Sequence, residues 1–258
     1  MYKMIVSDFS GTLINSDEAI SVSTMLELDR VRKNGVIFCI TTSKGIRVVK
    51  DYNRDFPFID YIVAFNGSYI YDLNNDNVIY DKSISISNVK KIYKLFSSKD
   101  LCLYTLDYCN YMGSYKDKDY SELLIDGSSF IEENKRGIYK ISIHVDSLKD
   151  AKNVVKEIKS NEIKVDCFIV EEDNHYIVEI TNGSNSKLKA IEKISKLNKI
   201  KMSEVLAVCS SESSCSLVES VGCGCCVSNA DKSVKKAANE ITDSNEEKGV
   251  ESIIKKYF

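Results

Sequence analysis

Asp8 is the first residue of the chain whose type and position suit chemistry. It follows the short apolar run Met4–Val6 and is followed by Ser10 and Gly11. An apolar run closed by Asp, Ser and Gly is typical of a buried parallel strand that ends in a tight turn. Open α/β sheets build their sites just past the carboxyl ends of such strands. Asp8 is therefore a candidate site residue, with a strand-capping aspartate as the structural alternative.

Thr42 is a second candidate, because it follows the apolar run Val36–Ile40. Neighbouring parallel strands end side by side, so we expect Thr42 to lie close to Asp8. Its hydroxyl and the following amides, at the start of a helix, can hold a phosphate oxygen. An ordinary helix N-cap is the alternative interpretation.

Lys187 lies in the first turn of a clear amphipathic helix, Ser186–Leu197. The helix dipole does not favour a cation at this end, and a lysine there is more often a solvated surface charge. After that helix, the apolar run Val205–Val208 predicts another buried strand, and the serine-rich segment Cys209–Ser214 follows it.

These residues are positioned by an alternation of buried strands and helices. Strand, helix and strand of these lengths predict right-handed βαβ units. Between residues 82 and 185 the strands instead alternate between apolar and polar residues, which favours an antiparallel sheet with one open face. His144 and His175 lie in such alternation and are expected to be half-exposed strand residues. We predict an α/β fold: a doubly wound parallel (Rossmann-like) sheet core, residues 1–81 and 186–258, with an inserted α+β cap domain, residues 82–185.

Composition excludes several classes of protein. The 258 residues carry a net charge of −3, which argues against a nucleic-acid binder. No run approaches the roughly 20 apolar residues of a membrane span. Because the N-terminus enters a strand directly, we expect no signal peptide and a cytoplasmic location. The nine cysteines are expected to be reduced, and Cys223–Cys226 is interpreted as buried strand rather than as a metal site. The oligomeric state is not predicted.

The motifs around the candidate residues resemble those of the haloacid dehalogenase-like superfamily, in its Cof-type phosphatase branch. Asp8 opens a segment similar to the motif D-x-D-G-T-L, with Ser10 in place of the second aspartate. Thr42 begins a segment similar to T-G-R, in which Ser43 and Lys44 stand for glycine and arginine.

The resemblance continues to the end of the chain. Lys187 matches the lysine of G-x-x-K-G. The segment Cys209–Ser214 occupies the place of G-D-x-x-N-D, so that Ser210 and Ser214 stand for both aspartates and Ser213 for the asparagine. Three more segments resemble the motifs M-L-E-A-A-G, M-G-N-A-D and T-x-S-N-x-x-D-G-V, namely Leu217–Gly222, Val227–Asp231 and Thr242–Val250.

This resemblance implies a Mg²⁺-dependent phosphatase that forms an aspartyl-phosphate. It assigns the roles of the site residues as follows: catalysis to Asp8 and Ser10, phosphate binding to Thr42, Ser43 and Lys187, and metal binding to Asp8, Ser10, Ser210 and Ser214. The expected ligand is a small phosphorylated metabolite.

The serine substitutions predict that catalysis is lost or severely impaired. A seryl hydroxyl does not protonate a leaving group at neutral pH, and Mg²⁺ prefers carboxylate oxygens, so Mg²⁺ binding is expected to be weak or absent. The alternative is a non-catalytic binder of a phosphorylated metabolite or of a protein partner. Asp8 and Lys187 together carry no net charge, whereas a site with four aspartates, one Mg²⁺ and one lysine carries one negative charge. Metal-free phosphate binding therefore remains possible.

Overall fold

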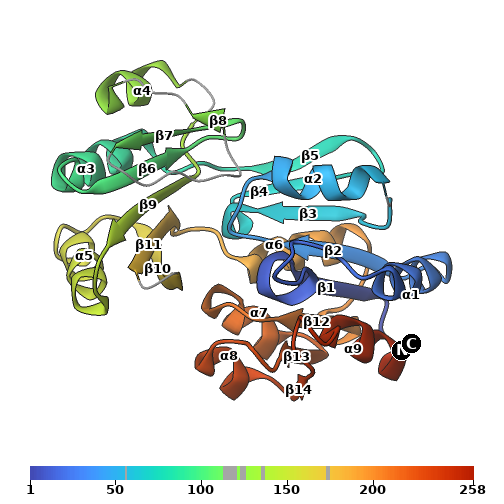
Figure 1. The fold of residues 1–258 in the computed structure, drawn as a ribbon. Helices are drawn as coiled ribbons and strands as arrows, with labels where there is room; N and C mark the ends of the chain where they lie inside the picture. The colour runs from blue at the N-terminus through green and yellow to red at the C-terminus, as the bar shows by residue number, and fades with distance from the viewer. Residues whose placement is uncertain (56, 113–120, 123–125, 135–136, 173–174) are drawn as a thin grey trace. The chain divides into compact units, whose positions relative to one another are not determined.

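The computed structural model describes residues 1–55, 57–112, 121–122, 126–134, 137–172 and 175–258. The chain divides into two compact units (Figure 1). Met1–Tyr80 and Ser186–Phe258 form the first, and Asp81–Asn185 forms the second. None of the helices in these described ranges has the length and hydrophobicity that crossing a lipid bilayer requires.

An eight-stranded sheet forms the centre of the first unit. Its strands are β1 (Met4–Asp8), β2 (Ile37–Thr41), β3 (Tyr61–Ala64), β4 (Tyr69–Asp72), β5 (Asn77–Asp81), β12 (Val205–Cys209), β13 (Cys223–Val227) and β14 (Glu240–Thr242). Their order is β14-β13-β12-β1-β2-β3-β4-β5. β1 runs parallel to both of its neighbours, β2 and β12, and β4 runs antiparallel to β3. Every residue of β1 and β12 is buried, as their continuous apolar runs predict.

Helices lie on both faces of this sheet (Figure 1). They are α1 (Val22–Lys33), α2 (Ile46–Asp55), α6 (Lys187–Leu197), α7 (Cys215–Ser220), α8 (Lys232–Ala237) and α9 (Gly249–Tyr257). The chain moves from β1 toward β3 in one direction and from β12 toward β14 in the other. Right-handed crossovers therefore place α1 and α2 on one face and α7 and α8 on the opposite face. Contacts of α9 with α1, and of α6 with α7, extend these two layers.

The second unit has its own six-stranded sheet, of order β10-β11-β9-β6-β7-β8. The strands are β6 (Asp100–Tyr104), β7 (Tyr108–Met112), β8 (Ser121–Glu122), β9 (Lys140–Val145), β10 (Val165–Glu172) and β11 (His175–Asn182). The helices α3 (Ile86–Phe96), α4 (Gly127–Glu133) and α5 (Leu148–Ser160) contribute to one hydrophobic core with this sheet. In the part of this sheet that the structure describes, the strand pairs are antiparallel except the short pair of β7 with β8. The predicted fold class, a doubly wound parallel sheet with an inserted α+β domain, is confirmed.

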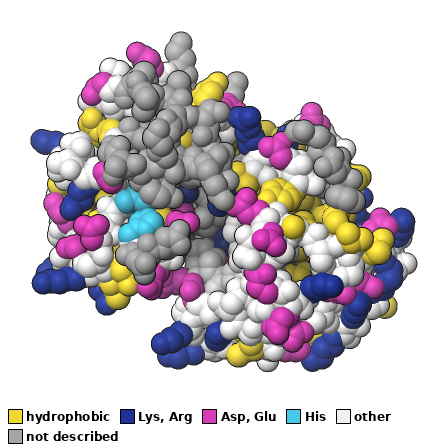
Figure 2. All heavy atoms as spheres, in the orientation of Figure 1, with side chains coloured by type: hydrophobic (Ala, Val, Ile, Leu, Met, Phe, Trp, Pro, Cys, Tyr) yellow, Lys and Arg dark blue, Asp and Glu magenta, His cyan; other side chains and the backbone are white. Residues whose placement is uncertain are grey.

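The prediction that His144 is half-exposed is wrong. All six residues of β9 are buried, and His144 is only 8% exposed. The reason is that the neighbouring strands β11 and β6 carry large side chains against its polar residues: His175 stacks on His144, and Tyr104 Oη lies 3.2 Å from Ser142 Oγ. Ser142 Oγ lies 3.1 Å from His144 Nε2, and the half-buried His175 stacks on the His144 ring at 5.7 Å between ring centroids. Figure 2 shows histidine side-chain surface gathered in one small patch on this face of the molecule.

The buried His144 predicts that the protein loses stability in mild acid. Burial lowers the pKa of His144 to about 4, helped by the positive charges of His175 and Lys140 and opposed by Asp100 and Glu179. Between this value and the ordinary histidine pKa near 6.5, the unfolded chain binds a proton that the folded chain does not. Stability therefore falls as the pH drops from about 6.5 to about 4. A pKa difference of this size corresponds to at most about 3 kcal/mol, and screening by solvent lowers the loss expected from this residue to about 1–2 kcal/mol.

Urea unfolding near neutral pH and at about pH 4.5 measures this loss. The variant His144→Gln, which does not titrate, is expected to lose less stability between the two conditions than the wild type. An equal loss in both proteins would contradict the assignment to His144.

Candidate active site

Asp8 lies at the point where the strand order of the first unit reverses. In the parallel pairing Ser7 faces Val208 of β12, and Asp8 itself faces Thr41 of β2. The three strands thus end at the same edge of the sheet, with Asp8 between the segments that follow β2 and β12. Such a switch point is where open α/β sheets place ligand sites.

The Asp8 carboxylate is buried, with 2% of the residue exposed, and both of its oxygens accept hydrogen bonds. Oδ1 accepts from Thr41 Oγ1 at 2.6 Å, Lys187 Nζ at 2.8 Å and Ser214 Oγ at 2.9 Å. Oδ2 accepts from the backbone amides of Ser210 and Ser211 at 3.1 and 3.3 Å, and from the hydroxyls of Ser211 and Ser214 at 3.1 and 2.8 Å. Five residues therefore solvate this carboxylate in place of water.

Lys187 is a buried partner of Asp8 rather than a solvated surface charge. Its side chain is 3% exposed, and its ammonium donates to Asp8 Oδ1, to Ser211 Oγ at 3.0 Å and to Ser214 Oγ at 2.9 Å. These three bonds use all three donors of the ammonium. Ser186 caps the helix by accepting from the amide of Lys189, and the Asp8 charge offsets the unfavourable position of Lys187 at a helix N-terminus.

The environment of Asp8 keeps it ionised. Burial alone raises the pKa of a carboxyl group, but the Lys187 charge and the hydrogen bonds from Lys187, Thr41 and the Ser210 amide outweigh that effect. The net result is a pKa of Asp8 below its ordinary value. The site therefore holds an anion and a cation whose charges cancel.

Thr41, not its neighbour Thr42, supplies the threonine hydroxyl that contacts Asp8. Thr42 is buried, but its hydroxyl accepts from the Lys44 amide at 3.0 Å and so caps the turn after β2. Ser43, the next predicted phosphate-binding residue, lies in the same turn. Thr41 was missed because the resemblance points to Thr42. The parallel register, which pairs Asp8 with Thr41, is the signal that identifies it.

Ser10 lies on an exposed, extended part of the turn that follows β1. This turn is wider than an α-helical turn, because Ile14 N donates to Phe9 O, five residues earlier. Gly11 adopts a left-handed conformation (φ +68°) within it, which favours glycine, and an added Cβ would lie 3.5 Å from Ser210 Oγ. Ser10 is not one of the five residues that the described structure shows bonded to Asp8.

Two asparagines from the C-terminal third hold this turn in place. Asn229 Nδ2 donates to Gly11 O at 2.9 Å, and Asn245 Nδ2 donates to Ile14 O at 3.0 Å. Asn245 N also donates to Asn229 Oδ1, which joins the two. These asparagines belong to the segments similar to M-G-N-A-D and T-x-S-N, so the motifs position the turn after Asp8.

Asp231 holds the serine-rich segment after β12 in place, as the two asparagines hold the turn after β1. Its carboxylate accepts from the Glu212 amide at 2.8 Å, and its own amide donates to Ser210 O at 2.9 Å. Asp231 and Glu212 are both exposed. The contacts of Asp231 orient the backbone that presents the Ser210 and Ser211 amides to Asp8.

The residues present do not fit Mg²⁺. This ion needs near-octahedral oxygen ligands, usually with more than one carboxylate or phosphate among them. Among the predicted metal-binding residues, Ser210 and Ser214 offer hydroxyls, and the carboxylate of Asp8 is bonded to the Lys187 ammonium at 2.8 Å. Among the described residues no group of three or more His, Cys, Asp or Glu side chains is placed to hold a metal ion.

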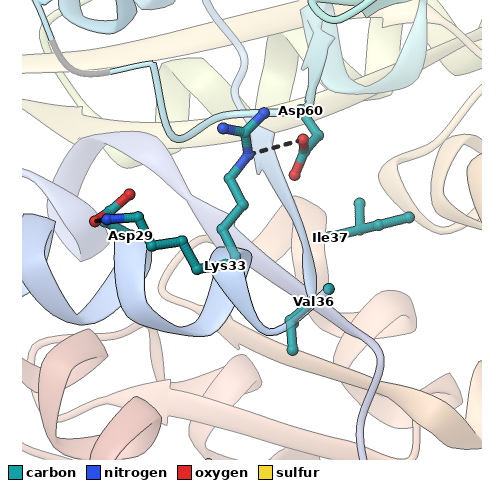
Figure 3. A pocket seen from close by; sticks show the side chains of 7 residues that line it. Asp29, Lys33, Val36, Ile37 and Asp60 are labelled. Carbon is teal, nitrogen blue, oxygen red and sulfur yellow. Dashed lines mark hydrogen bonds and ion pairs between the residues drawn. The ribbon is translucent and has the colours of Figure 1, made fainter.

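A surface hollow of about 360 Å³ lies at the opposite, amino-terminal edge of the same sheet (Figure 3). Its charged side chains are paired with one another. Arg32 Nε donates to Asp60 Oδ1 at 3.0 Å, and Lys33 forms an ion pair with Asp29 at 2.6 Å. Asp60 also accepts from the Phe38 amide, which ties the hollow to the start of β2. These contacts are structural, and the hollow is not the site around Asp8.

The chain is similar to known hydrolases along its whole length. The model of the haloacid dehalogenase-like hydrolase family matches residues 5–254. The 5-amino-6-(5-phospho-D-ribitylamino)uracil phosphatase YitU of Bacillus subtilis (strain 168) is 24% identical, over 99% of this chain and 97% of its own. The pyridoxal phosphate phosphatase YbhA of Escherichia coli (strain K12) is 22% identical, over 94% of each chain. A solved haloacid dehalogenase-like hydrolase from B. subtilis has a TM-score of 0.87 at 18% identity, over 99% of this chain and 100% of that chain, which shows a shared fold.

Proposed function

Since the chain belongs to the haloacid dehalogenase-like hydrolase family, we propose that it is a Cof-type member that binds a small phosphorylated metabolite and has lost most or all of its phosphatase activity. The names of its relatives support the ligand class, because YitU and YbhA are named as phosphatases of small phosphorylated compounds. The observation that carries the proposed loss of activity is the set of contacts made by Asp8.

Asp8 is poorly prepared to act as a nucleophile. Attack on phosphorus needs a carboxylate oxygen with a lone pair directed at the substrate. Asp8 Oδ1 already accepts from Lys187 and Ser214, and Asp8 Oδ2 from Ser211 and Ser214. The same contacts lower the pKa of Asp8 and with it the basicity of the carboxylate. Ser10 offers no acid to protonate the leaving group, and this alone costs about 10²–10⁴-fold in rate.

Binding of a phosphorylated ligand has different requirements from hydrolysis, and the site meets the requirements of binding better than those of hydrolysis. Asp8 and Lys187 carry no net charge together, so an incoming anion is not repelled by unpaired carboxylates. Thr42 and Ser43 lie in the turn after β2, beside the strand that contacts Asp8. Backbone amides and hydroxyls of such a turn are suited to a phosphate oxygen.

Hydrolysis of a panel of phosphate monoesters, with and without Mg²⁺, tests the proposal. We expect turnover at least about 10²-fold below that of the relative YitU on its own substrate, and no stimulation by added Mg²⁺. The variant Asp8→Asn serves as the control for contaminating phosphatases. Mg²⁺-dependent turnover that Asp8→Asn abolishes would show a working enzyme and contradict the proposed loss.

A further inference from the structure

The side chain of Asn66 is buried without a hydrogen-bond partner. The residue is 3% exposed, and within the described parts of the chain neither its Nδ2 nor its Oδ1 has a partner. Buried polar groups in folded proteins almost always have a hydrogen-bond partner. A buried side-chain amide without one destabilises the folded protein. An unpaired amide of this kind calls for an explanation.

The backbone around Asn66 is also unusual. Phe65, Asn66 and Gly67, which follow β3, all have positive φ angles, of 47°, 53° and 100°. Asparagine and glycine tolerate this left-handed region, but a bulky residue such as Phe65 is strained there. Strain of this kind persists only where surrounding contacts enforce it, and it gathers at functional sites.

The contacts that hold this turn come from both predicted phosphate-binding segments. Phe65 N donates to Lys44 O at 3.1 Å, and Asn66 N donates to Thr42 O at 3.0 Å. On the other side Gly67 packs so closely against Ser186 that an added Cβ would lie 2.3 Å from Ser186 O. Ser186 directly precedes Lys187, so Asn66 lies between the Thr42 turn and the start of α6.

We propose that Asn66 is an anion-binding residue of this site, whose Nδ2 donates to an oxygen of a bound phosphate group. This inference rests on the proposed function. Thr42 and Lys187 make their side-chain hydrogen bonds within the protein, to Lys44, Asp8, Ser211 and Ser214. The side-chain amide of Asn66 has no such partner among the described residues. Both amide atoms are enclosed, so phosphate reaches Asn66 only after neighbouring side chains of the site move.

Calorimetric titration with inorganic phosphate, without Mg²⁺, tests this role. Asn66→Gly keeps the left-handed backbone and removes the amide, and Asn66→Asp keeps the shape but replaces the donor with a negative charge. We expect both to weaken phosphate binding about tenfold or more. Glu162→Gly is the matched control, because Glu162 is exposed in the second unit with φ 52°, and phosphate binding should not change.

The outcomes separate this inference from the proposed function. If the wild type binds phosphate and Asn66→Gly binds it equally well, asparagine is present only for its backbone conformation, and the anion-binding role is overturned. If the wild type binds no phosphate, both the role of Asn66 and the proposed ligand class fail. Thermal unfolding confirms that each variant is folded, and Asn66→Asp keeps the test decisive if Asn66→Gly does not fold.

Discussion

The triple variant Ser10→Asp, Ser210→Asp and Ser214→Asp is expected to hydrolyse aryl phosphates about 10²–10⁴-fold faster than the wild type, and only with Mg²⁺. The three carboxylates would supply the acid and the metal ligands that the family motifs carry at these positions. Mg²⁺ would then offset the charge on the phosphoryl oxygens, which Lys187 alone does not. Initial rates across a Mg²⁺ titration measure the effect.

The structure indicates why the substitutions must be combined. Ser214 is fully buried, and its hydroxyl lies within 2.9 Å of both Asp8 and Lys187. An aspartate there, without metal, places two carboxylates against one ammonium, so the triple variant should be more stable with Mg²⁺ than with a chelator. Ser10→Asp alone should change the rate little, because an acid without the metal leaves the phosphoryl charge unopposed.

Asp8→Asn in the triple variant is the control for mechanism, since an amide cannot serve as the nucleophile. It should remove the gained activity. A wild type that already matches the triple variant, and that Asp8→Asn silences, would mean that the serines do not impair catalysis.

Lys187→Met is expected to lower the free energy of unfolding by about 3–5 kcal/mol, the usual cost of leaving one partner of a buried ion pair unpaired. Asp8 would remain buried with serine hydroxyls and amides but without a counter-charge. Asp8→Asn should also destabilise the protein, because it leaves the Lys187 ammonium buried without a counter-charge. The double variant with Asp8→Asn and Lys187→Met should lose less free energy of unfolding than the sum of the two single variants. Urea unfolding of the four proteins measures these differences.

Lys255→Met is the matched control for removing a lysine. Lys255 pairs with Glu251 at 2.6 Å, but its side chain is 56% exposed, so Lys255→Met should destabilise the protein far less than Lys187→Met. Equal losses in Lys187→Met and Lys255→Met would contradict the view that burial makes the Asp8 pair important.

The Asp8 pair also has an expected pH dependence. Because the pKa of Asp8 is lower in the folded chain than in the unfolded chain, its stabilisation is complete above an unfolded pKa of about 3.9. It is lost as the pH falls further, through the lower folded value. Below about pH 4, the stability of Asp8→Asn should therefore fall less with decreasing pH than that of the wild type. The loss due to His144 occurs above this range, so the two effects are separable.

The sequence by itself determined the architecture and most of the candidate site. Continuous apolar runs such as Met4–Val6 and Val205–Val208 predict buried parallel strands, and these strands are neighbours in the structure. Their carboxyl ends bring Asp8 and the serine-rich segment to one edge, where Lys187, at the start of α6, joins them. This succeeded because hydrophobic periodicity and parallel topology are encoded locally and repeated along the chain.

Only the tertiary structure decided which donors satisfy Asp8. Thr41 rather than Thr42 reaches the carboxylate, because a one-residue difference in register sends a strand side chain to the opposite face. Sequence patterns also did not predict that the side-chain amide of Asn66 lacks a hydrogen-bond partner or that His144 is buried. Both depend on what packs against a residue from distant parts of the chain, and residue type and spacing do not report such contacts.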